Sequence, residues 1–134
     1  MTTNYVAHQL GNEREAITLE LIQQIAKSTP WMRMVRPATH AEDWSGKDIV
    51  IETAHGDVLV QVKGCKAAAQ AWRKLYRDTI GPYCVMVRFK DLTMINPDTL
   101  RNRLLAVYQL RIREYWANVS GVDISAECEK EARQ

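Results

Sequence analysis

The sequence predicts one α/β domain of 134 residues, a three-layer sandwich with a small mixed sheet between helices in the order α-β-β-β-α-β-α. Residues 48–63 read as two alternating strands joined by a short turn, and residues 82–90 are the most strand-like run in the chain. Segments with helical periodicity precede and follow these strand-like runs. An apolar content of 46% and a charged content of 25% are typical of a folded domain. We expect its core over residues 12–118 and a tail over residues 119–134.

The first helix is expected over residues 12–28, after a loose leader at residues 1–11. Asn12 can cap this helix, and acidic residues in its first turn suit the helix dipole. Its apolar residues recur at helical spacing: Ile17, Leu21, Ile22 and Ile25.

Pro30 ends the first helix, and residues 31–36 alternate like a strand. Residues 37–47 contain Pro, Ser and Gly without periodicity, so we expect a loop there. The strands 48–53 and 57–63 follow, and we expect them to pair as an antiparallel hairpin.

The second half of the chain alternates helix, strand and helix. Residues 66–80 are rich in good helix formers, and Gly81-Pro82 stops that helix before the strand at residues 82–90. A last helix is expected over residues 97–118, with this apolar stripe: Leu104, Leu105, Tyr108, Ile112, Tyr115 and Trp116.

Composition argues against several classes of protein. The sequence has no apolar run long enough to span a bilayer and no signal peptide, so we expect a cytoplasmic protein. The cysteines and histidines show no spacing typical of a disulfide framework or a zinc site. These residues are Cys65, Cys84, Cys128, His8, His40 and His55.

The net charge of +2 is unevenly distributed along the chain. Residues 1–62 carry a net charge of −3, residues 63–113 carry +8 and residues 114–134 carry −3. A basic middle segment favours a phosphate-binding face, although scattered Lys and Arg also occur on solvated helix faces.

Polar residues of the hairpin form the strongest candidate site. Gln61 and Lys63 lie two residues apart on one strand and so share a face of the sheet, and Asp48 opens the neighbouring strand. Carboxylate and amide oxygens beside an ammonium group suit a hard cation and a developing negative charge. The alternative is a half-exposed hairpin whose polar side chains face water.

The first helix offers an additional carboxylate. Glu13 and Glu20 fall on the same edge of the apolar stripe, whereas Glu15 points away from it. They lie about 10 Å apart along the axis by helical rise, so both cannot reach one metal ion. Glu20 is slightly favoured, because it is nearer the end of the helix that leads into residues 31–36.

The order of elements and the hairpin residues resemble the PD-(D/E)XK nuclease superfamily, which has the restriction-endonuclease-like fold. The matches are Asp48 for the strand acid, Gln61-Val62-Lys63 for the (D/E/Q)-x-K triplet and Glu13 or Glu20 for the helix acid. The phrase GKDIVIETAHGDVLVQVKG looks most like the Mrr-type and Holliday-junction-resolvase-like branches. The resemblance covers residues 12–90, with Lys47 in place of the usual Pro and Gln61 in place of the usual Glu.

This resemblance implies an endonuclease that hydrolyses DNA phosphodiester bonds with Mg²⁺ or Mn²⁺. Asp48, Gln61 Oε1 and the Val62 carbonyl would bind the metal ion, and Lys63 would stabilise the charge that develops on the phosphate. Because Gln61 supplies no charge, a catalytically silent fold that serves in nucleic-acid binding or protein assembly remains the alternative. A small-ligand or protein-interaction domain is a third.

The expected partner is duplex or branched DNA, bound by basic residues of the middle segment and by a loop tryptophan that can stack on a base. The apolar stripe of the last helix is a candidate homodimer surface, or else packs in the core. The expected DNA contacts are Arg36, Trp44, Lys66, Arg73, Lys74 and Arg77.

Overall fold

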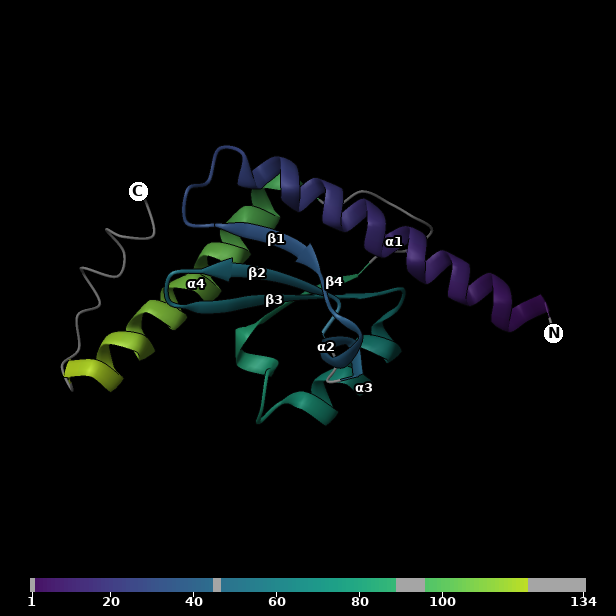
Figure 1. The fold of residues 1–134 in the computed structure, drawn as a ribbon. Helices are drawn as coiled ribbons and strands as arrows, with labels where there is room; N and C mark the ends of the chain where they lie inside the picture. Colours follow the sequence, from purple (N-terminus) through teal and green to yellow (C-terminus); the bar gives the residue numbers. More distant parts are fainter. Residues whose placement is uncertain (1, 45–46, 89–95, 121–134) are drawn as a thin grey trace.

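The computed structural model describes residues 2–44, 47–88 and 96–120 and contains one four-stranded sheet (Figure 1). The strands β1 to β4 follow one another across the sheet in sequence order. β1–β2 and β2–β3 are antiparallel and β3–β4 is parallel, which confirms the mixed sheet and the hairpin pairing. The strands are β1 (Met34–Pro37), β2 (Ile49–Thr53), β3 (Gly56–Lys63) and β4 (Cys84–Arg88).

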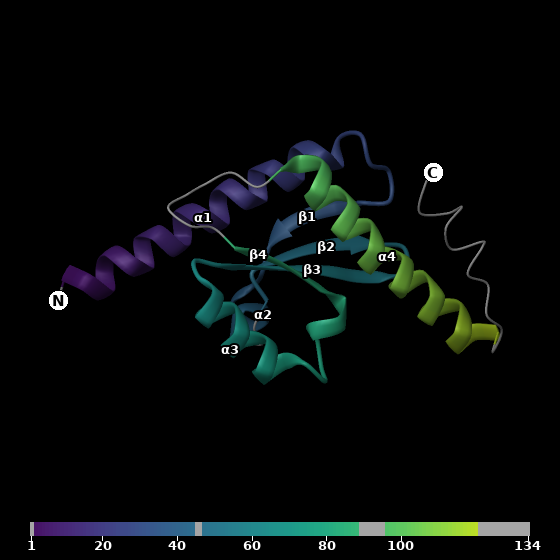
Figure 2. The same ribbon diagram turned by 180° about the vertical axis from the view of Figure 1, so that it is seen from behind.

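Helices cover both faces of the sheet. The helices α1 (Thr2–Ala26) and α4 (Pro97–Ser120) lie on one face, and α3 (Lys66–Tyr76) lies on the other (Figures 1 and 2). The short helix α2 (His40–Trp44) connects β1 to β2, and the 3₁₀ turn η1 (Gly81–Tyr83) leads into β4. The N-terminal end of α1 extends past the edge of the sheet (Figure 1).

The alternation of β3 explains why the two faces differ. Val58, Val60 and Val62 pack into the core formed with α1 and α4, since strand side chains alternate between faces. Gln61 and Lys63 therefore point to the opposite face, toward α3. There Ala69 and Trp72 of α3 pack on Met86 in a smaller core, which leaves room for polar groups.

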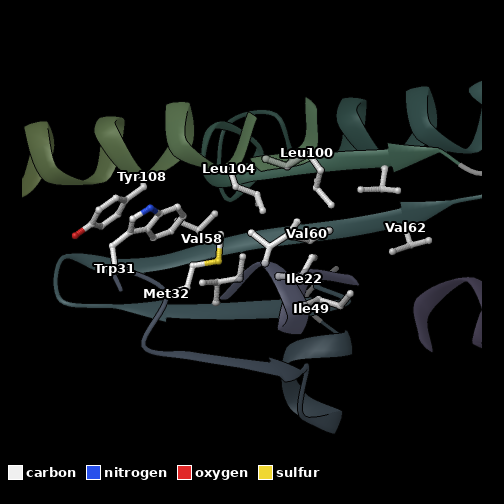
Figure 3. Close-up of a cluster of buried hydrophobic side chains, with 14 of the residues drawn as sticks. Ile22, Trp31, Met32, Ile49, Val58, Val60, Val62, Leu100, Leu104 and Tyr108 are labelled. Atoms are coloured by element: carbon white, nitrogen blue, oxygen red, sulfur yellow. The ribbon is translucent and has the colours of Figure 1, made fainter. Parts of the chain in front are cut away.

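The larger core joins distant parts of the sequence. Ile22 of α1 and Leu104 of α4 are fully buried against the valines and isoleucines of the sheet (Figure 3). Trp31 stacks on Tyr108 with ring centroids 4.3 Å apart (Figure 3). Burying a large aliphatic side chain contributes about 1.5–3 kcal/mol, so this core is the main stabilising feature of the fold.

The turn of the hairpin is fixed by α4. Gly56 has a φ of 116°, a conformation that residues with a Cβ rarely adopt. Arg111 of α4 donates a hydrogen bond from Nε to the Asp57 carbonyl oxygen at 2.7 Å. His55 Nδ1 and Tyr108 Oη are 3.1 Å apart. These contacts hold the turn of the β2–β3 hairpin against α4.

The structure corrects three of the predicted elements. α1 begins at Thr2, so residues 2–11 of the predicted leader are helical; a single glycine, Gly11, costs only about 1 kcal/mol in a helix. β1 begins at Met34, because Trp31 and Met32 turn into the core instead of pairing. The predicted loop at residues 37–47 contains α2, which is too short to show periodicity.

The other boundaries differ by a few residues. α3 ends at Tyr76, and α4 runs from Pro97 to Ser120. The predicted tail from residue 121 onward, and the last two residues of the predicted strand 82–90, lie outside the described residues. Within the described ranges, no helix is long and apolar enough to cross a membrane.

Candidate functional site

Asp48 is held at the start of β2 by the neighbouring strand. Its Oδ2 accepts a hydrogen bond from the Val62 N–H at 2.8 Å, and the Gln61 side chain also donates to this carboxylate. Its main-chain oxygen accepts the Ala38 N–H at 2.9 Å. Burial outweighs these bonds and raises the pKa of Asp48. The carboxylate is therefore both fixed in place and desolvated.

Gln61 brings an unpaired oxygen to the same place. The residue is 3% exposed, and its Oε1 is buried with no hydrogen-bond partner within the described part of the chain. A buried acceptor without a partner costs about 1–3 kcal/mol. This oxygen belongs to the side chain that donates to Asp48, and a cation or a water molecule would satisfy it.

Two hollows meet at Asp48, Asp43 and Lys63. One has a volume of about 660 Å³ and lies between α1, the segment before β2 and the end of β3. The other has a volume of about 460 Å³ and lies between β3 and α3, where Gln61 lines it. The structure therefore brings Asp48, Gln61 and Lys63 together, as the spacing of the hairpin predicts.

The helix carboxylate at this site is Glu15. It lines the larger hollow, where burial, followed by the charges of Asp48 and Asp43, raises its pKa to about 7 against the opposing effect of Lys63. Glu13 and Glu20 are exposed and line neither hollow. The structure thus brings Glu15 to Asp48, and neither of the two glutamates that the sequence singled out.

The position of Glu15 follows from the buried line of α1. Thr18, Ile22 and Ile25 are the buried residues on this line, and the Thr18 hydroxyl donates to the Arg14 carbonyl oxygen at 2.7 Å. Glu15 lies three residues before Thr18, so it continues the same line by one turn. Because α1 runs past the sheet edge, that turn meets the hollow instead of the core (Figure 1). Counting Thr18 with the buried residues of α1 predicts that Glu15 lies on the same face of the helix.

A capping box positions α2 and the Asp43 carboxylate. The Glu42 N–H donates to Thr39 Oγ1 at 3.2 Å, and the Thr39 N–H donates to Glu42 Oε1 at 2.9 Å. Asp43 then follows directly and lines both hollows. The sequence motif T-x-x-E is the signal for this helix start.

Arg36, one of the predicted DNA contacts, forms ion pairs within the protein. Its Nη1 and Nη2 donate to Oε1 and Oε2 of Glu42 at 2.5 and 3.0 Å, and its Nε donates to Oε2 of Glu52 at 2.7 Å. These carboxylates raise the pKa of Arg36 and neutralise its charge. Arg36 thus links β1, β2 and α2.

Arg14 and Gly64 close one side of the larger hollow. Both residues line it, and a side chain at Gly64 would collide with the Arg14 guanidinium. The absence of a Cβ at Gly64 therefore lets Arg14 approach the end of β3. Sequence reasoning missed Arg14, because it lies one position before Glu15 in a segment with no motif.

The other predicted DNA contacts are spread over α3. Arg73, Lys74 and Arg77 line a separate hollow that also contains Arg103 of α4, which the sequence did not single out. Lys66 is exposed at the start of α3. Trp44 is the last residue of α2, and its side chain lies outside what the structure describes.

The donor set at Asp48 suits a hard, partly hydrated cation. Glu15, Asp48 and Gln61 offer two carboxylates and an amide oxygen, which favour Mg²⁺ or Mn²⁺ over zinc. Among the described residues no group of three or more His, Cys, Asp and Glu side chains is arranged to hold a metal ion. The cation would therefore depend on Gln61 and on water, and would bind weakly. The Val62 contribution seen here is its N–H bond to Asp48.

Comparisons with known proteins give no functional assignment. No protein-family model, curated protein or solved structure matches the chain.

Proposed function

We propose that the chain is a metal-dependent endodeoxyribonuclease of the cytoplasm with a restriction-endonuclease-like fold. The observation that carries the proposal is the meeting of Glu15, Asp48, Gln61 and Lys63 around the ends of β2 and β3. The parallel β3–β4 pair beside an antiparallel hairpin supports the same resemblance. Glu15 now takes the place of the helix acid.

Glu15, Asp48 and Gln61 Oε1 would hold Mg²⁺ or Mn²⁺. When bound, the ion supplies positive charge at the phosphate and the leaving oxygen. It would also offset the charges of Asp48 and Asp43, which together with burial raise the pKa of Glu15.

The chain's own residues supply the remaining chemistry. Lys63 lines both hollows and places an ammonium group where negative charge develops on the phosphate. The Val62 N–H and the Gln61 amide hold Asp48 in one orientation. Basic residues of α3 and the residue after it would contact the DNA backbone: Lys66, Arg73, Lys74 and Arg77.

The test is nicking of supercoiled plasmid and cleavage of a four-way junction with Mn²⁺ and with Mg²⁺. Glu15→Ala, Asp48→Ala and Lys63→Ala are each expected to abolish cleavage. Glu13→Ala and Glu20→Ala are the matched controls, since both change an exposed glutamate of the same helix, and they are expected to keep wild-type activity. Cleavage that survives Asp48→Ala would rule out this site.

A catalytically silent binding module is the second candidate. It is favoured by Gln61 in place of an acid, and by the lack of a three-residue metal-binding group among the described side chains. In that case wild-type protein binds DNA without cleaving it under any of these conditions. We include a homodimer in both proposals, because Tyr115 and Val119 leave apolar surface exposed on α4.

A further inference from the structure

A third hollow lies on the α3 face of the sheet, on the other side of Trp72 from the Asp48 site. It has a volume of about 560 Å³ and is enclosed by α3, η1, β4 and α4. That volume is in the range of pockets that hold small organic ligands, roughly 300–1,000 Å³. Apolar groups form part of its lining: Trp72, Pro82, Cys84 and Met86.

Four cationic side chains surround this apolar lining. Arg73 and Lys74 come from α3, Arg77 directly follows α3, and Arg103 comes from α4. No carboxylate lines the hollow in the described part of the chain, and there neither Arg73, Lys74 nor Arg103 has an ion pair. Arg77 contacts Asp78 at 3.7 Å, but both side chains are more than three-quarters exposed, so this pair is weak.

The cations crowd one another. Partial burial, followed by the charges of Arg73 and Arg88, lowers the pKa of Arg103. An anion in the hollow would relieve this repulsion. The thiol of Cys84 adds no negative charge, because burial raises its pKa to about 12.

We propose that this hollow binds a single nucleotide unit that carries a terminal phosphate, with the phosphate on Arg73 and Arg103 and the base against Trp72 and Met86. A phosphate monoester carries about −1.5 to −2 charges at neutral pH, whereas each backbone diester carries one. Several unpaired cations around one small cavity therefore match the monoester better. The apolar lining is suited to a base, since stacking on an aromatic side chain contributes about 1–3 kcal/mol.

The same chemistry occurs in a free mononucleotide and at the 5′ end of a DNA strand. The inference shares three basic residues with the proposed DNA-binding surface, but it needs neither a metal ion nor the Asp48 site. Its failure and the failure of the nuclease proposal are therefore separable.

Isothermal titration calorimetry in metal-free buffer tests the proposal with dAMP, deoxyadenosine and inorganic phosphate. We expect dAMP to bind at least about tenfold more tightly than either of the other two, because they lack the phosphate or the base. Equal affinities for dAMP and deoxyadenosine, or no binding of dAMP, would overturn the phosphate site. Equal affinities for dAMP and phosphate would overturn the base site.

Substitutions of the lining residues test whether dAMP binds in this hollow. Arg103→Gln and Arg73→Gln are each expected to weaken dAMP binding about tenfold, the effect of removing a charge-assisted contact. Arg113→Gln is the matched control on α4, since Arg113 is exposed and does not line the hollow. Asp48→Ala is expected to leave dAMP binding unchanged. An affinity unaffected by Arg103→Gln and Arg73→Gln contradicts the proposal.

Two oligonucleotide arms separate the sources of the nucleotide. A single-stranded oligonucleotide with a 5′-phosphate is compared with the same strand ending in a 5′-hydroxyl. A preference of about tenfold for the phosphorylated strand assigns the hollow to strand ends. Equal binding of the two strands, with dAMP still bound at Arg103, assigns it to a free nucleotide.

Discussion

Glu15 makes the stability of the protein depend on pH in an unusual direction. Its pKa is raised from 4.5 to about 7, so the folded state binds more protons than the unfolded state between those values. Stability should therefore fall as the pH rises from 4.5 to 7. Glu15→Gln removes this penalty and is expected to stabilise the protein by about 2 kcal/mol at pH 8 and not at pH 4.

Urea unfolding at pH 4, 6 and 8 measures this difference. Glu20→Gln is the control, since it makes the same change at an exposed position of α1. If Glu15→Gln and wild type have the same free energy of unfolding at pH 8, then burial and the neighbouring carboxylates do not destabilise the ionised form of Glu15. Divalent metal should also reduce the difference, since the ion would stabilise the ionised form of Glu15.

Gln61→Glu places a third carboxylate beside Asp48 and Glu15. In EDTA the variant should lose about 2 kcal/mol of stability, because a buried charge is added next to two others. Mn²⁺ or Mg²⁺ should restore that stability and hold or raise the nuclease activity. Thermal unfolding with EDTA and with Mn²⁺ measures the effect, with Gln70→Glu as the exposed control on α3. A metal-independent Tm in Gln61→Glu would argue against a cation site.

Residue spacing was sufficient for the hairpin part of the site and insufficient for the helix part. Strand alternation fixes the common face of Gln61 and Lys63, and pairing brings Asp48 beside them. Glu15 was not predictable in the same way, since the fully buried residues of α1 include the polar Thr18, whereas Ile17 and Leu21 are only partly buried against the core. Thr18 in the sequence points to the face of α1 on which Glu15 lies, but which turn of α1 overhangs the sheet depends on tertiary packing.

At the scale of elements, Glu42 ties α2 to the sheet through Arg36. Hydrogen bonds from Arg36 and Thr39 lower the pKa of Glu42 from 4.5 to about 2. Because that pKa is depressed, the stabilisation is present above pH 4.5 and is lost as the pH falls toward 2. Glu42→Gln is expected to destabilise the protein by about 1–2 kcal/mol at pH 7 and by much less at pH 2.5.

Guanidinium unfolding of wild type and Glu42→Gln at both pH values measures this loss. Asp78→Asn is a suitable control, because Asp78 is exposed and its contact with Arg77 is long. An equal loss of stability at both pH values would mean that Glu42 acts through its shape and not its charge. The same variant should lower nuclease activity, since α2 positions Asp43 beside Asp48.

Local patterns predicted strands and long helices better than short elements. Short continuous apolar runs mark β2, β3 and β4, because consecutive residues of each strand are buried on both faces of the sheet. Pro97 marks the start of α4. The five residues of α2 carry no period, so only their cap is visible in the sequence. α1 continues through Gly11 because the turns on either side are helical, although glycine itself disfavours the helix interior.

At the scale of the whole molecule, the basic α3 surface should govern DNA binding. Arg73→Glu combined with Lys74→Glu is expected to weaken binding about tenfold at 100 mM salt, and to lower the slope of log K against log salt by about 2. Lys27→Glu combined with Arg33→Glu is the control, because these exposed residues lie away from α3. Fluorescence anisotropy with duplex and four-way-junction DNA measures both. Binding that survives the α3 reversal unchanged would mean that this surface is only solvated.

The packing of α1 against α4 has a consequence during translation. Ile22 and Leu104 pack on the same face of the sheet and share one core, so the core around α1 stays incomplete on the nascent chain until α4 leaves the ribosome. The intervening stretch of about 80 residues takes roughly 4–16 s to synthesise at typical rates. The β2–β3 hairpin joins neighbours in sequence and can form much earlier. The ribosome therefore holds an unfinished core for most of the synthesis time, and chaperones have that interval in which to bind it.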